Sequence, residues 1–190
     1  MRIAIARAVS IVGHPVALIS GCGLIAASTH GASPVQMRTI GATLLLLAVV
    51  VVGFTWFQVK AGRWAHVDAS ARTERVSLNL FLATLLLASA VLVWLVLHNL
   101  HMSVALVLSA TLIVAALLLA RWVKMSLHVA FAAFATALLW PLLWAVAAGS
   151  LITAAVAWSR LTLGRHVLAD VIVGLLLGTL AGFAYDVWLG

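Results

Sequence analysis

Apolar residues fill this chain in long runs that short polar segments separate. Seven of these runs predict membrane-crossing helices, at residues 11–28, 39–59, 78–97, 103–120, 127–140, 142–158 and 167–189. Most approach the ~20 residues that an α-helix needs to cross the hydrocarbon core of a bilayer. Every backbone polar group at membrane depth must be satisfied within its own segment, so we expect an all-α, polytopic bundle of about six to seven transmembrane helices.

Composition supports this class, since 66% of the residues are hydrophobic and only 8% are charged. We expect a single integral membrane domain over residues 1–190, without a separate soluble domain. Cys22 has no second cysteine to pair with, and no Cys/His array has zinc spacing, so neither a metal nor another cofactor is indicated. Arg2 and Arg7 before an apolar run also resemble a signal peptide, but the membranous remainder favours an uncleaved first helix.

The segments at 127–140 and 142–158 are the shortest of the seven. About 15 residues make roughly 22 Å of helix, less than the ~30 Å hydrocarbon core. Pro141 and the small residues at 147–150 favour a turn. If both segments form helices, the chain reaches Ser159 on the same membrane face that it left at Ser126, whereas one long helix would place these residues on opposite faces.

Charged residues gather on one face of the predicted bundle. With seven crossings, ten of the eleven Lys and Arg residues share this face, and only Arg38 lies opposite. A charge at the bilayer centre costs ~2.5–3.5 kcal/mol on insertion scales, so any membrane protein segregates its cations. Topology alone does not explain the acids and histidines on the same face, namely Asp68, Glu74, Asp170, His66, His128 and His166. A net charge of +7 in short loops indicates anionic lipid or phosphate as the partner rather than nucleic acid.

The cations also bear on orientation, because cytoplasmic loops carry an excess of Lys and Arg. Phosphate-binding cations would bias this count, but without them five arginines still oppose Arg38, namely Arg2, Arg7, Arg63, Arg72 and Arg121. We therefore expect a multi-pass protein of the plasma membrane, the inner membrane of a bacterium, with this face in the cytoplasm.

The segment from Ser159 to Asp170 carries the densest chemistry. His166 and Asp170 are four residues apart and share a face if the last helix begins near Arg165. A carboxylate that accepts from one imidazole nitrogen fixes the tautomer and leaves the other nitrogen free to attack. Arg160 and Arg165 can neutralise phosphoryl oxygens, which carry most of the transition-state charge. The alternative is a polar pair packed between helices near the membrane interface.

Glycines lie on both sides of this chemistry, one in the loop before the last predicted helix and three within that helix. Gly164 is expected to let the loop approach a ligand closely. Gly174, Gly178 and Gly182 recur at every fourth position, which predicts a ridge against which a neighbouring helix packs closely. We expect the last helix to be central in the bundle.

The pattern Ser-Arg, five residues, His, three residues, Asp resembles the third signature motif of the type-2 phosphatidic acid phosphatase superfamily at every signature position. This resemblance implies that His166 is the phosphoryl-accepting nucleophile, that Asp170 orients it, and that Arg160 binds phosphate. Further candidates for phosphate binding in this motif are Ser159, Gly164 and Arg165.

The family's second motif, Pro-Ser-Gly-His, opens a helix, and Met125-Ser126-Leu127-His128 keeps its Ser and His. The resemblance implies that His128 is the general acid and that Ser126 contacts phosphate. Leu127 replaces the family's glycine, which removes a permissive backbone, and Lys124 is placed to compensate.

The family's first motif, Lys, six residues, Arg-Pro, has no counterpart with the same spacing. By order and charge we assign phosphate binding to Lys60 and Arg75, with Arg63 as the alternative. Asp68 and Glu74 are expected to pair with arginines of their own loop rather than to act as acids or bases.

The implied activity is that of a metal-independent membrane phosphatase, with its motif-bearing core at about 60–188. It would hydrolyse a lipid phosphomonoester or diphosphate through a phosphohistidine intermediate, with phosphatidic acid, phosphatidylglycerol phosphate and polyprenyl (di)phosphates as candidate substrates. A non-catalytic carrier or flippase for phosphate lipids is the main alternative, and a structural membrane subunit is a third. His14 and Pro15 predict a kink or a bundle-facing histidine, without an assigned role.

Overall fold

The structure is a computed structural model that describes residues 1–65, 69 and 71–189. These residues form eight α-helices, and no strand occurs among them, which confirms the predicted all-α class. The helices are α1 (Arg2–Val12), α2 (Pro15–Thr29), α3 (Pro34–Lys60), α4 (Arg72–Leu97), α5 (Leu100–Leu119), α6 (Leu127–Ala137), α7 (Leu143–Thr162) and α8 (Leu168–Leu189). His66 and Asp68, which the sequence assigns to the charged face, lie outside the described residues.

Five helices are long and apolar enough to cross a membrane, namely α3, α4, α5, α7 and α8. Helices α1 and α2 together would form a sixth span, bent by 50° at the break between them. Large apolar side chains project outward, as for Leu151 on α7, which is 74% exposed, and Phe183 on α8, which is 65% exposed. Such surfaces are favourable in lipid and unfavourable in water. The chain is an integral, multi-pass membrane protein.

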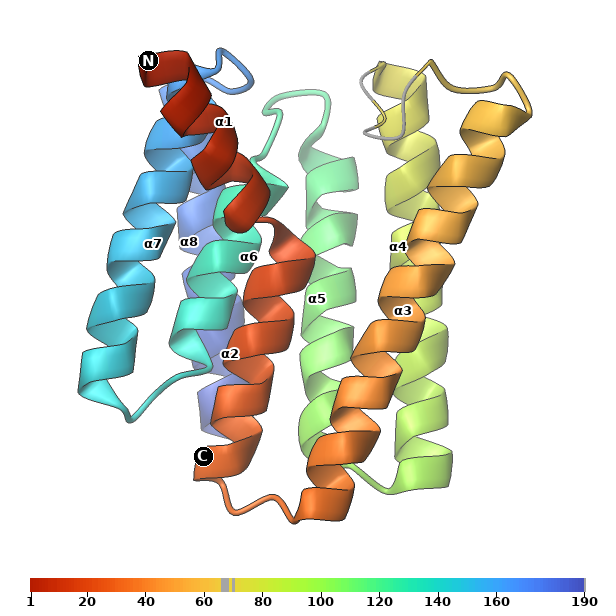
Figure 1. Cartoon of the computed structure of the whole chain (residues 1–190), viewed down its shortest axis with the longest axis vertical. Helices are drawn as coiled ribbons and strands as arrows, with labels where there is room; N and C mark the ends of the chain where they lie inside the picture. Colours follow the sequence, from red (N-terminus) through yellow and green to blue (C-terminus); the bar gives the residue numbers. More distant parts are fainter. Residues whose placement is uncertain (66–68, 70, 190) are drawn as a thin grey trace. The chain divides into compact units, whose positions relative to one another are not determined.

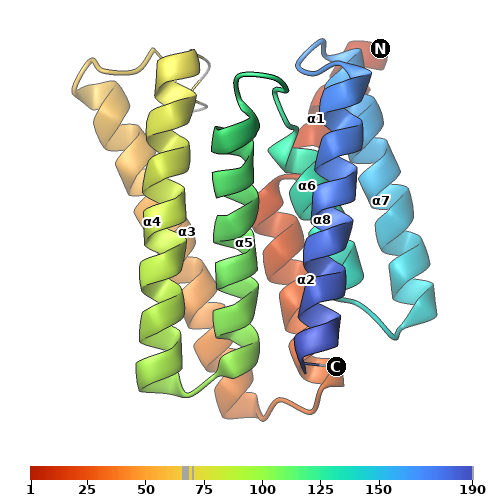
Figure 2. The same cartoon turned by 180° about the vertical axis from the view of Figure 1, so that it is seen from behind.

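The chain divides into two compact units, residues 1–37 with 118–190, and residues 38–117. In the first unit, α6 lies at the centre and contacts α2, α7 and α8, while α1 packs on α7 (Figures 1 and 2). Every residue from Val129 to Thr136 of α6 is buried. The expectation that α8 is the central helix is therefore wrong for this unit, because the small alanines of α6 let it occupy the middle.

The predicted glycine ridge on α8 is confirmed, and its neighbour is α6. A Cβ atom at Gly174 would lie 2.7 Å from the carbonyl oxygen of Ser126, and one at Gly178 would collide with the carbonyl oxygen of Ala130. Backbone atoms cannot move away as a flexible side chain can, so both positions require glycine. The ridge holds the start of α6 against the first turns of α8.

The first predicted crossing, 11–28, contains the end of α1 and nearly all of α2, and the rest of α1 precedes it, so the described residues form one helix more than the sequence predicts. Pro15 is the first residue of α2, where its missing N–H costs nothing and its ring blocks continuation of α1. His14 is the N-cap, and its Nδ1 accepts the backbone N–H of Val16 at 3.3 Å. The predicted kink at His14-Pro15 is confirmed.

The two short predicted segments are unequal in the structure. Helix α6 has 11 residues, about 16 Å, too short to cross the hydrocarbon core, whereas α7 has 20 residues and can cross it. The boundary predicted at residue 158 is wrong, because nothing breaks the helix before Thr162 and Ser159 and Arg160 form part of it. The predicted return of the chain is confirmed, since the start of α6 bonds to the start of α8.

Gly164 ends α7 rather than approaching a neighbour. Its φ is +63°, and no atom lies within 4 Å of the position that a Cβ would occupy. The N–H of Gly164 bonds to Leu161 O at 3.0 Å and that of Arg165 to Arg160 O at 3.1 Å, the Schellman pattern of helix termination. The glycine is needed for the left-handed backbone, and its expected close approach to a ligand stays a prediction.

The second unit contains most of α3, all of α4 and most of α5. Phe54 of α3 stacks on Phe81 of α4 with ring centroids 3.8 Å apart, and Ser103 Oγ of α5 donates to Ala90 O of α4 at 2.9 Å. Glu74 is buried, and its carboxylate accepts the backbone N–H groups of two residues before α4, Ala65 and Ala71, each at 2.9 Å. This carboxylate organises the start of α4.

Candidate active site

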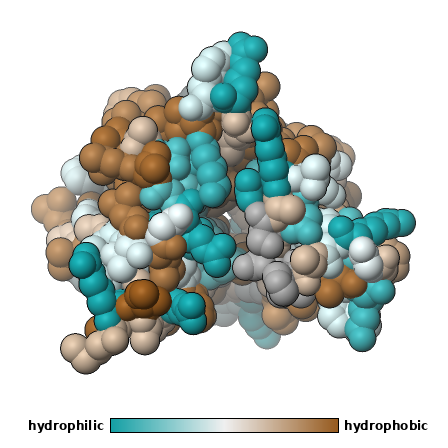
Figure 3. All heavy atoms as spheres, turned by 90° about the horizontal axis from the view of Figure 1, so that it is seen from above, coloured by the Kyte–Doolittle hydropathy of each residue, from teal (hydrophilic) through white to brown (hydrophobic). Residues whose placement is uncertain are grey.

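Polar side chains gather at one end of the first unit, where α8 begins. Figure 3 looks onto this end and shows hydrophilic residues grouped among apolar ones. Beneath them, Val129 of α6, Val156 of α7 and Val171 of α8 form a buried cluster. Val129 and Val171 directly follow His128 and Asp170, and Val156 lies about one helical turn before Ser159, so the core holds the site's three helices together.

Two acceptors hold the Nδ1 atom of His166. It lies 2.9 Å from the carbonyl oxygen of Lys124 and 3.3 Å from Oδ2 of Asp170. A carbonyl oxygen can only accept, so Nδ1 carries the proton, and in the neutral ring Nε2 keeps its lone pair. The contact with Asp170 is the one that the spacing of the two residues predicts, and the carbonyl of Lys124 is a second orienting group that the sequence does not reveal.

The carboxylate of Asp170 joins the two loops that carry the second and third motifs. Its Oδ1 accepts the N–H of Lys124 and its Oδ2 accepts the N–H of Val167, both at 3.1 Å. Across the same junction, Lys124 Nζ donates to Arg165 O at 2.9 Å. The side chain of His166 is only 9% exposed within this junction, which fixes its position.

Three helices begin next to one another at this site. Ser126, the N-cap of α6, donates its backbone N–H to the carbonyl oxygen of Asp170 in the first turn of α8, at 3.1 Å. His14, the N-cap of α2, lies against His128 in the first turn of α6. Each helix N-terminus carries partial positive charge, so the junction of α2, α6 and α8 favours an anion.

Two buried polar atoms at this end have no hydrogen-bond partner among the described residues, Ser126 Oγ and Arg160 Nε. Arg160 lies in the last turn of α7, and its Nη1 donates to Ser10 Oγ of α1 at 2.9 Å. An unsatisfied buried polar atom costs about 1–3 kcal/mol, and such atoms in native proteins commonly face a ligand or water. The predicted phosphate contacts of Arg160 and Ser126 fit this pattern.

The predicted general acid, His128, lies among cationic and imidazole groups. Burial, followed by the charges of Arg160, His14 and His166, lowers the pKa of His128 to about 3. The same cause, burial, lowers the pKa of His166, with Arg160 as the next contribution, although its bonds to Lys124 O and Asp170 act in the opposite direction. Both rings are therefore neutral at physiological pH without a bound anion.

The remaining predicted residues have other positions. Ser159 is fully buried and its hydroxyl donates to Val156 O at 2.7 Å, so its donor is used within α7. The side chain of Arg165 is exposed beside the site. Lys60, 5.6 Å above the ring of Trp56, and Arg75 belong to the second unit, and their assignment to phosphate stays a prediction.

His14 is the residue that sequence reasoning missed. Its ring meets the ring of His128 edge to face, with centroids 5.5 Å apart and planes at 85°. The only signal in the sequence was a histidine placed directly before a proline inside an apolar segment. Such a residue caps the helix that follows, and here the cap faces the predicted general acid.

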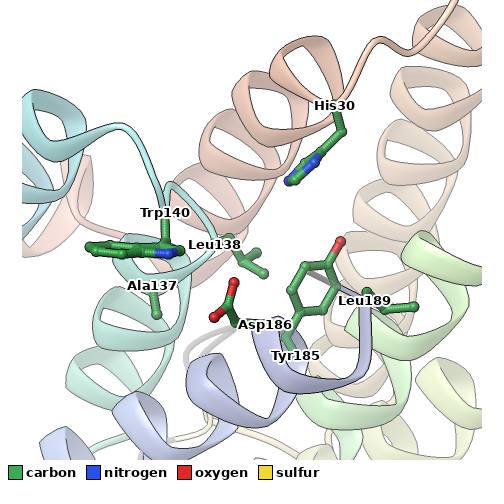
Figure 4. Close-up of a pocket in the computed structure, with 7 residues that line it drawn as sticks. All are labelled: His30, Ala137, Leu138, Trp140, Tyr185, Asp186 and Leu189. Carbon is green, nitrogen blue, oxygen red and sulfur yellow. The ribbon is translucent and has the colours of Figure 1, made fainter.

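A pocket in the first unit lies at the other end of α8 (Figure 4). It is lined by His30, Ala137, Leu138, Trp140, Tyr185, Asp186 and Leu189. Asp186 follows Asp170 by about 24 Å along the helix axis, so this pocket is separate from the predicted site. Among the described residues, no three His, Cys, Asp or Glu side chains converge as a metal site requires.

Comparison of the chain with protein-family models, curated proteins and solved structures found no match. The case for a function therefore depends on the residues of the first unit and their geometry.

Proposed function

We propose that this protein is a membrane-embedded phosphatase that hydrolyses a lipid phosphomonoester or diphosphate through a phosphohistidine on His166. The observation that carries the proposal is the His166 ring, whose Nδ1 proton is held by Lys124 O and Asp170 beside His128 and Arg160. A histidine with only a structural role would not need the lone pair of Nε2 to be kept beside three helix N-termini, where an anion is favoured.

In the first step, the Nε2 lone pair of His166 attacks phosphorus. The N–P bond forms as the bond from phosphorus to the leaving oxygen breaks, and the ring gains positive charge. Asp170 stabilises that charge through its bond to Nδ1. Arg160, with its unpartnered Nε, stabilises the negative charge on the phosphoryl oxygens.

The leaving oxygen takes a proton from His128. Without substrate this ring is neutral and lacks the second ring proton that a general acid gives up. That proton arrives with the substrate, which binds as a phosphate monoanion and passes it to the ring nitrogen of His128 that carries the lone pair. A bound anion also opposes the charge of Arg160, which lowers the pKa of His128. In the second step His128 accepts a proton from water as the oxygen attacks phosphorus and the P–N bond breaks.

Lipid is the proposed substrate class because the site lies at one end of apolar helices whose sides face lipid. The phosphate head would meet the polar end of the first unit while the tail enters between helices. The excess of arginines that the sequence predicts on the charged face supports an orientation of the site toward the cytoplasm, at the plasma membrane.

The test is phosphate release by protein purified in detergent, with a chelator present. Phosphatidic acid, phosphatidylglycerol phosphate and undecaprenyl diphosphate are the substrates, and His166→Ala is compared with His101→Ala, a matched change of an exposed histidine in the second unit. Release that His166→Ala abolishes and His101→Ala preserves supports the proposal. An acid-labile phosphoryl adduct on the protein would identify the intermediate.

One property of the site favours the carrier hypothesis: the lowered pKa of His128, which leaves this ring without the extra proton that a general acid gives up until substrate binds. It predicts that folded protein binds phosphate lipid and releases no phosphate from any of the three lipids. It also predicts that His166→Ala preserves binding and transport.

A further inference from the structure

We propose that His14 binds the phosphate group of the substrate through its Nε2–H, so that the amino-terminal helix pair completes the site. This inference rests on the proposed phosphate site and names a residue that the resemblance to lipid phosphatases does not include.

The tautomer of His14 follows from its capping role. Nδ1 accepts the backbone N–H of Val16 at 3.3 Å, so Nδ1 carries the lone pair, and the proton of the neutral ring is on Nε2. His166 has the opposite tautomer, because its Nδ1 donates to Lys124 O. One ring thus offers a nucleophile and the other a hydrogen-bond donor, and phosphoryl transfer needs both.

The position of His14 fits a phosphate contact. Its ring lies edge to face against His128, the residue proposed to protonate the leaving oxygen. Arg160, whose Nε has no hydrogen-bond partner among the described residues, adds its charge to the surroundings of His128 and reaches α1 through Ser10. A phosphate that meets both His128 and Arg160 lies within reach of a donor on His14.

The break between α1 and α2 is held firmly enough to position this donor. A Cβ at Gly13 would collide with Val156 Cγ2 of α7, so the chain passes directly against that helix. Ala6, about two helical turns before Gly13, is fully buried, and Ser10 accepts a hydrogen bond from Arg160 at 2.9 Å. The amino-terminal helices therefore form a fixed wall of the site.

Two substitutions separate the cap from the donor. In His14→Asn, the side-chain oxygen replaces Nδ1 as acceptor for Val16 and the Nε2–H is lost. In His14→Gln, the amide nitrogen replaces Nε2–H as donor, while the cap is weakened. A neutral donor to a charged acceptor contributes about 10- to 100-fold in affinity.

The experiment measures the dissociation constant for inorganic phosphate in the His166→Ala background, where no turnover occurs, together with Tm. The same His14 variants, with His166 intact, are assayed beside the wild-type enzyme for hydrolysis of phosphatidic acid in mixed micelles. We expect His14→Asn to weaken phosphate binding about 10- to 100-fold and to raise KM with little change in kcat, at an unchanged Tm. His14→Gln should restore most of the affinity and lower Tm slightly.

Unchanged phosphate binding in His14→Asn would overturn the inference, as would equal losses in both variants, which would reduce His14 to a helix cap. If phosphate binds and depends on His14 while no lipid is hydrolysed, the phosphatase proposal fails and the binding role of His14 stands. If wild-type protein binds no phosphate, both fail. Weakened binding of phosphatidic acid with unchanged binding of inorganic phosphate would assign His14 to the rest of the lipid head, contrary to the inference.

Discussion

Replacing Asp170 by asparagine tests which group holds the catalytic tautomer of His166. Nδ1 donates to Lys124 O at 2.9 Å and to Asp170 Oδ2 at 3.3 Å, so the backbone acceptor is the closer one. It survives the substitution, and we expect the Nδ1–H tautomer to survive with it. The loss is then that of a charged acceptor for a developing imidazolium, ~1.5–3 kcal/mol, or about 10- to 100-fold in kcat.

This expectation differs sharply from that for a histidine oriented by a carboxylate alone. In the Ser-His-Asp triad, the same substitution costs about 10⁴-fold in kcat because the imidazole adopts the wrong tautomer. Here the cost to folding has a separate origin. An asparagine amide nitrogen in place of Oδ1 would face the N–H of Lys124, now 3.1 Å from that oxygen, and leaving this partly buried donor unsatisfied costs at most about 1–3 kcal/mol.

The assay combines kcat for the best lipid substrate, Tm in detergent, and ¹⁵N NMR of labelled histidines, which reports the tautomer without turnover. Asp186→Asn is the matched control, since Asp186 lines the pocket at the other end of α8. A fall in kcat of about 10⁴-fold, together with a His166 signal of the Nε2–H tautomer, would refute the role of the Lys124 carbonyl.

Three further predictions concern packing, protonation and orientation. Gly178→Ala places a methyl group on the carbonyl oxygen of Ala130 and should destabilise the first unit by about 1–3 kcal/mol, seen as a lower Tm. Because the pKa of His128 falls from 6.5 in the unfolded chain to about 3 in the folded one, the unfolded protein binds more protons between these two values, so stability should rise with pH across this window by up to ~1.4 kcal/mol per unit. His128→Gln should remove that slope in Tm against pH, and an unaltered slope would assign it elsewhere. Thr73→Cys, next to Arg72 on the predicted charged face, should escape labelling by an impermeant thiol reagent in intact cells when tested in a Cys22→Ala background. Labelling would place the charged face outside the cell.

Much of the fold could be predicted because its determinants are local. A run of apolar residues specifies a membrane helix by length alone. Pro15 breaks the first run whatever other helices that run contacts, because its ring and its missing N–H act locally. The spacing of four between His166 and Asp170 requires only that a helix begin nearby. Gly174 and Gly178 predict close packing, because no residue but glycine leaves a groove for another backbone.

The lengths of α6 and α7 were less predictable. Both segments are apolar throughout, so hydropathy does not show where one helix ends and the next begins. Tertiary packing decided this, with α6 surrounded by α2, α7 and α8, and α7 extended to the glycine turn at Gly164.

The sequence by itself determined that this is a multi-pass helical membrane protein with a histidine–aspartate pair at the start of its last helix. Only the tertiary structure decided what surrounds that pair. The carbonyl of Lys124, 42 residues from His166, orients the ring, yet a backbone oxygen has no signature in a sequence. Ser10 meets Arg160 across 150 residues, and His14 meets His128, because the bend at Pro15 turns the amino-terminal helices against α6 and α7. Contacts between distant segments depend on how helices pack, and that is a property of the whole unit rather than of any one segment.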